Sequence, residues 1–124
     1  MFWRLVAQFV LSLVAGVVIW AASPMVTGEV EPWDSASVYY PGALFAAGFL
    51  CGWVAPASLF FTFLGIYLGQ FGYLLIALPD GPLWIVGVFV LLMYTSIAFA
   101  GALLTWLLHR LFAPSWAVTA TPEP

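Results

Sequence analysis

The residues able to do chemistry in this chain are few, and the largest group is acidic. Glu29, Glu31 and Asp34 fall within residues 23–37, the one long polar interval of a chain that is 65% hydrophobic and 6% charged. Carboxylate oxygens are ligands for divalent cations and also attract a basic surface of a partner. Because the three acids have an irregular spacing that matches no ligand pattern, we expect a solvated outer loop. The alternative is external docking through these acids and Trp33.

The remaining reactive side chains do not form a catalytic set. The chain has one cysteine, Cys51, and one histidine, His109. A lone cysteine excludes an intrachain disulfide and a cysteine-rich zinc site, and one histidine cannot supply both axial ligands of a haem within one chain. No general base is placed beside a serine or cysteine nucleophile. We therefore expect no enzyme activity, no cofactor and no metal.

The composition predicts an integral membrane protein. A mean hydropathy of +1.14 over 124 residues lies far above the range of soluble domains. Arg4 and Arg110 are the only lysine or arginine residues, which excludes the clustered Lys and Arg of a nucleic-acid-binding surface. The lipid bilayer is the first expected partner.

Apolar runs separated by proline predict one polytopic domain over residues 1–124, an all-α bundle of four transmembrane helices with short loops. Pro24 and Pro56 end the first two runs, and residues 79–82 (Pro-Asp-Gly-Pro) form a strong turn signal. The expected helices are residues 3–22, 38–55, 58–78 and 83–110, with an outer loop at 23–37 and a flexible tail at 113–124. A cleaved signal peptide is the alternative for the first run.

The two arginines set the expected orientation. Cationic residues near helix ends favour the cytoplasm, and Arg4 and Arg110 share one side only if the number of crossings is even. Four crossings give cytoplasmic N- and C-termini and an outer acidic loop. Aromatic residues at both boundaries agree with this threading, the inner belt being Trp3, Trp53 and Trp106 and the outer belt Trp20, Trp33, Tyr39, Tyr40 and Trp84.

Small residues recur at the spacing of one helical face and predict close helix packing. Lipid tails are as apolar as leucine, so transmembrane helices associate largely by close packing at small residues. The candidate packing residues are Gly48, Gly52, Gly65, Gly69 and Gly101. In the fourth run, steps of four and three residues place Gly87, Leu91, Tyr94, Ala98, Gly101 and Thr105 on one face.

Neutral polar residues inside the apolar runs give the best indication of a functional site in this sequence. Ser12, Tyr67, Gln70 and Tyr94 fall at similar depth when residues are counted from the helix ends, which predicts a hydrogen-bonded layer near the midplane. We expect this layer to join helices to one another. The alternative is the lining of a pore.

The expected function is that of a small, non-catalytic accessory or scaffold subunit that assembles with other integral membrane proteins. The alternative is a homo-oligomeric channel or facilitator for a neutral or weakly polar solute, lined by Tyr67, Gln70 and Tyr94. The absence of lysine favours a bacterial inner membrane, where the chain would be a multi-pass protein.

Overall fold

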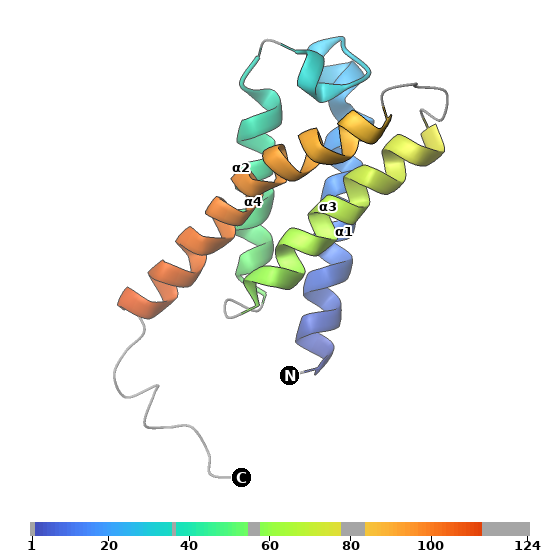
Figure 1. The fold of residues 1–124 in the computed structure, drawn as a ribbon. Coiled ribbons are helices and arrows are strands. Elements are labelled where there is room, and N and C mark those ends of the chain that lie inside the picture. The colour runs from blue at the N-terminus through green and yellow to red at the C-terminus, as the bar shows by residue number, and fades with distance from the viewer. Residues whose placement is uncertain (1, 36, 55–57, 78–83, 113–124) are drawn as a thin grey trace.

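The computed structural model describes residues 2–35, 37–54, 58–77 and 84–112, and every element in these ranges is helical. The helices are α1 (Phe2–Thr27), the short 3-10 helix η1 (Pro32–Asp34), α2 (Tyr39–Gly52), α3 (Leu59–Ala77) and α4 (Trp84–Phe112). Figure 1 shows α1 and α3 running towards the end of the bundle that carries η1, and α2 and α4 running back. The all-helical class and the four helices agree with the sequence prediction.

Three of the helices, α1, α3 and α4, are long and apolar enough to cross a membrane. The exception is α2, whose 14 residues extend about 21 Å at 1.5 Å per residue, short of a hydrocarbon core about 30 Å thick. The expected second span of residues 38–55 is therefore longer than the helix in the structure, which ends at Gly52. Beyond Gly52 the backbone tightens, because Trp53 N–H donates to Leu50 and Val54 N–H donates to Cys51.

The first helix is longer than expected, since α1 continues through Pro24 to Thr27 and not to residue 22. Proline removes one backbone donor, and so close to the end of the helix this costs a single hydrogen bond. Thr27 Oγ1 donates to the Ser23 carbonyl at 2.9 Å, which satisfies part of the last turn. Gly28 then ends the helix at φ +81°, a backbone angle that glycine adopts without strain.

The helices form a ring in the order α1, α3, α4, α2. The two most extensive interfaces are α1 with α3 and α2 with α4, and Figure 1 shows that each of these pairs runs in parallel. The antiparallel neighbours α3 with α4 and α1 with α2 touch over smaller areas, and within the described helices α1 and α4 do not meet. The bundle is thus two parallel helix pairs packed side by side.

Glycine allows the backbones of each parallel pair to touch. A methyl group at Gly69 of α3 would overlap the Leu13 carbonyl of α1, and one at Gly65 would lie 2.6 Å from Ser12 Cβ. In the other pair, Gly48 of α2 lies against the Ala98 carbonyl of α4. These distances leave no room for any side chain at the crossing points, so the glycines fix how closely the helices approach.

The predicted inner face of α4 is confirmed. Gly87, Leu91, Ala98, Gly101 and Thr105 are buried, and Tyr94 is half-buried on the same face. Gly101 of this face packs against the Phe45 carbonyl of α2, and Thr105 Oγ1 donates to the Phe49 carbonyl at 2.7 Å. Opposite faces remain exposed and apolar, as Phe89 and Met93 show at 67% and 63% exposure.

Two parts of the aromatic belt prediction need correction. Trp20 and Tyr40 are 0% and 1% exposed and lie inside the bundle, so they cannot belong to a belt at the lipid interface. Their polar tips have buried partners, which removes the need for water. The turn at residues 79–82, Pro56 and the tail at 113–124 lie outside the described residues, as does the side chain of Trp84.

Candidate functional site

One buried glutamine connects all four α-helices. Gln70 of α3 is fully buried, and its Oε1 accepts hydrogen bonds from Trp20 Nε1 of α1 at 3.1 Å and from the Tyr40 hydroxyl of α2. Its Nε2 donates to Thr95 Oγ1 of α4 at 2.9 Å and to the Ile66 carbonyl at 3.3 Å. We call Trp20, Tyr40, Gln70 and Thr95 the Gln70 hub.

The hydrogen-bonding capacity of the Gln70 amide is completely used. A carboxamide has two acceptor lone pairs and two N–H donors, and four partners occupy them. The indole N–H of Trp20 can only donate, which fixes Oε1 on its side of the amide. Thr95 in turn donates to the Leu91 carbonyl at 2.6 Å, so the chain of donors ends on the backbone of α4.

Aromatic rings enclose the hub on the side of η1. Trp20 meets Trp33 edge to face at 4.7 Å between ring centroids, and Tyr40 meets Tyr94 at 4.6 Å. A further tyrosine, Tyr73, lies 6.3 Å from Trp20. Water is kept from the amide by these rings, and in such a dry environment each hydrogen bond of the hub is stronger than it would be in water.

The acidic loop folds onto the bundle through its tryptophan. Trp33 packs against the buried core, with its ring 3.4 Å from where a methyl group at Gly87 of α4 would lie, and its Nε1 donates to the Glu31 carboxylate at 2.7 Å. Pro32 beside it is fully buried. Glu29 is exposed, and the side chain of Asp34 is not described. Of the proposed docking residues, Glu29 faces solvent, whereas Glu31 and Trp33 already interact within the chain.

A second group of buried polar residues lies nearer the N-terminal end of α1. Gln8 Nε2 donates to Thr62 Oγ1 of α3 at 2.6 Å, and the Ser12 hydroxyl lies near the Cys51 thiol of α2. Gln8, Ser12 and Thr62 are fully buried, and Cys51 is 9% exposed. We call this group the Gln8 cluster; its residues come from three helices, and its hydrogen bond joins α1 to α3.

The structure separates the four residues of the predicted midplane layer. Gln70 and Tyr94 approach each other through Tyr40, whereas Ser12 belongs to the Gln8 cluster. Tyr67 is half-buried beside α4, and its hydroxyl donates to the Val88 carbonyl at 3.2 Å. The three partners of Gln70 are not among the predicted layer residues. Trp20 and Tyr40 fall in the predicted outer aromatic belt, and Thr95 follows Tyr94 directly in the chain.

The opposite end of the bundle carries cationic side chains. Arg110 in the last turn of α4 lies over the Trp106 ring, with its guanidinium carbon 5.3 Å from the ring centroid. His109 packs on Trp53 of α2 at 4.4 Å between ring centroids. Among the residues described, no three histidine, cysteine or acidic side chains gather as a metal site.

These features define a class of protein: a helical bundle with three candidate membrane spans, held together internally by neutral polar groups. Comparison of the chain with protein-family models, with curated proteins and with solved structures finds no match. Functional inference therefore rests on the geometry of the chain itself.

Proposed function

We propose that this chain is a small, non-catalytic accessory or scaffold subunit of a larger membrane protein complex. It spans a bacterial inner membrane with α1, α3 and α4, while α2 returns the chain, and both termini lie in the cytoplasm. Assembly with other integral membrane subunits is its function, and it needs no cofactor.

The observation that supports this role most directly is the internal use of the Gln70 amide. A solute pathway through the chain would need polar atoms that face an open space, yet all four hydrogen-bonding positions of Gln70 are occupied by its own helices. Tyr94 and Tyr67, the other expected lining residues, pack against Tyr40 and donate to a backbone carbonyl respectively.

The outward surface supports the same role. Besides its apolar side chains, α2 presents Gly42 and Ala46 on an exposed face, and a methyl group at Gly42 would meet nothing within 4 Å. This face offers the small-residue spacing by which transmembrane helices approach closely, and no helix of the described chain uses it. The short α2 helix adds to the argument, because a neighbouring subunit can cover a segment too short to span alone.

Native purification tests the proposal. The protein is extracted from its own membrane in mild detergent, without overexpression, and the intact particle is weighed by native mass spectrometry. Stoichiometric unlike subunits are expected, and they would also identify the process served. A particle of identical chains only would contradict the accessory role and favour a channel. In that case the Gln70→Leu variant distinguishes two roles of the amide. If the amide lines the pathway, the variant loses solute flux. If the amide only connects helices, the variant is less stable but keeps its flux.

A further inference from the structure

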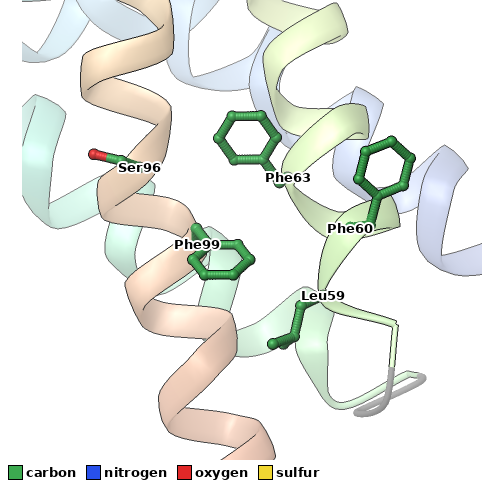
Figure 2. Close-up of a pocket in the computed structure, with 5 residues that line it drawn as sticks. All are labelled: Leu59, Phe60, Phe63, Ser96 and Phe99. Carbon is green, nitrogen blue, oxygen red and sulfur yellow. The ribbon is translucent and has the colours of Figure 1, made fainter.

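An apolar groove opens between α3 and α4 on the outer surface of the bundle. It has a volume of about 570 Å³ and is lined by Leu59, Phe60 and Phe63 of α3 and by Ser96 and Phe99 of α4. Figure 2 shows the rings of Phe63 and Phe99 in the space between the two helices, with the Phe60 ring on the other side of α3. The helices are tied near the η1 end by Tyr67 and Val88 and separate towards the other end.

A cationic residue continues the α4 side of this groove. Phe99, Leu103, Trp106 and Arg110 follow one another at steps of four, three and four residues, which places them along one face of the helix. Arg110 is exposed at the end of that face, and its guanidinium is stacked on Trp106 at 5.3 Å. Stacking orients the guanidinium and leaves its N–H donors free for an anion.

The length of this path matches one leaflet of a bilayer. Ser96 and Arg110 are separated by about 21 Å along α4 at 1.5 Å per residue, and half of the hydrocarbon core is about 15 Å. Since α4 is tilted relative to α1 (Figure 1), its vertical rise is shorter than its length. The apolar groove therefore lies at acyl-chain depth when Arg110 is at headgroup depth.

We propose that the groove and Arg110 together form a binding site for an anionic phospholipid. One acyl chain lies in the groove against the outer surface of the Phe63 and Phe99 rings, which contact each other edge to face at 6.2 Å between centroids. The headgroup phosphate accepts hydrogen bonds from the Arg110 guanidinium. Charge complementarity selects the lipid, because an arginine binds a phosphate in a fixed, two-pronged geometry and a net anionic headgroup adds to that attraction. This site does not depend on the accessory role and would exist in a particle of identical chains as well.

The headgroup contact is tested with two lipids of identical acyl chains, palmitoyl-oleoyl phosphatidylglycerol and palmitoyl-oleoyl phosphatidylcholine. Purified, delipidated protein in detergent is titrated with each lipid and its bound fraction is read by native mass spectrometry. The wild-type chain is expected to prefer phosphatidylglycerol, and Arg110→Gln is expected to lose about fivefold in affinity for it, equivalent to about 1 kcal/mol for one cationic side chain near a membrane surface. Arg4→Gln removes the other arginine at the same end and should leave the affinity unchanged.

The groove is tested separately with phenylalanine substitutions on one helix. Phe99→Ala removes a wall of the groove and should weaken the binding of both lipids, whereas Phe89→Ala removes an equally apolar, exposed ring outside the groove and should bind both like the wild type. Circular dichroism of each variant establishes that the helices are intact. Equal affinity of the wild type for the two lipids, or equal losses in Arg110→Gln and Arg4→Gln, would overturn the site.

Discussion

A glutamine in the middle of an apolar helix costs free energy unless every polar atom has a partner. Gln70 meets that condition by accepting from Trp20 and Tyr40 and donating to Thr95, residues contributed by three different helices. An apolar side chain of the same size would tolerate several rotations of the helices, whereas this amide is satisfied in one arrangement. We interpret the hub as the feature that fixes the register of the bundle, the best-attested role of a buried polar residue.

Replacing Gln70 by leucine tests this interpretation. The substitution leaves the donors of Trp20 and Tyr40 without their acceptor, while Thr95 keeps its bond to Leu91. Gln70→Leu removes three interhelical bonds, and at about 0.6 to 2 kcal/mol for each the free energy of unfolding should fall by about 2 to 6 kcal/mol. Unfolding in mixed micelles measures it. Tyr67→Phe, which removes a single half-buried bond, serves as the control and should cost the least; a Gln70→Leu protein as stable as this control would contradict the role of the hub.

Trp33 is the residue through which the acidic loop is attached. Its ring packs on Trp20 at 4.7 Å and reaches Gly87, so Trp33→Ala should destabilise the folded chain by about 2 kcal/mol, less than the roughly 3 to 5 kcal/mol of a fully buried tryptophan. Limited proteolysis between α1 and α2 should also become faster as the loop detaches. Val30→Ala, in the same loop and 49% exposed, is the control and should change neither measurement. Equal proteolysis of both variants would show that the loop is held by other contacts.

Only one residue of the Gln70 hub can be predicted from the sequence alone. This residue is Gln70, because a long polar side chain inside an apolar run must find partners. Its partners were not identified, because Trp20 and Tyr40 lie near predicted helix ends, where lipid-facing and bundle-facing aromatic residues have the same sequence appearance. Thr95 was equally ambiguous, since a threonine can bond its own helix, and in the structure it does so while also accepting from Gln70.

At the scale of elements, the stability of the bundle depends on two parallel helix pairs whose backbones touch. The glycine spacing predicted close packing from the sequence, but it could not say which helices would meet, because every GxxxG pair fits any apolar partner. The structure pairs α1 with α3 and α2 with α4, although neither pair is consecutive in the chain. The extension of α1 through Pro24 was also beyond the sequence pattern, since it depends on the bonds that Ser23 and Thr27 make beside Gly28.

Two glycines of α2 provide a matched test of the second pair. Gly48→Ala places a methyl group on the Ala98 carbonyl and should push α2 from α4, at a cost of about 1 to 3 kcal/mol for overpacking. Gly42→Ala places the same group in open space six residues earlier, where the better helix propensity of alanine, about 1 kcal/mol, can only help. Thermal unfolding by circular dichroism separates the variants. Equal melting temperatures would mean that the two helices move apart at no cost.

At the scale of the whole molecule, charge is divided between the two ends of the bundle. Arg4 in the first turn of α1 and Arg110 in the last turn of α4 lie at one end, and the loop with Glu29 and Glu31 lies at the other, as Figure 1 shows for the segments concerned. This division is what cationic residues facing the cytoplasm would produce. It requires α2 to return the chain across the membrane, although its helix extends only about 21 Å. In that orientation, local thinning of the bilayer or interfacial residues after Gly52 would make up the difference in length.

Single-cysteine labelling decides whether α2 returns the chain. Each test variant carries Cys51→Ala and one introduced cysteine: Arg4→Cys, Glu29→Cys or Phe112→Cys. Spheroplasts that express the variant are treated with a membrane-impermeant maleimide. Glu29→Cys should react at once, whereas Arg4→Cys and Phe112→Cys should react only after the membrane is opened, because an even number of crossings places both helix ends inside. Cys51→Ala itself, with no thiol, gives the background. Labelling of Phe112→Cys but not Arg4→Cys in closed cells would mean an odd number of crossings, and α2 would then be a segment that enters the membrane and leaves on the same side.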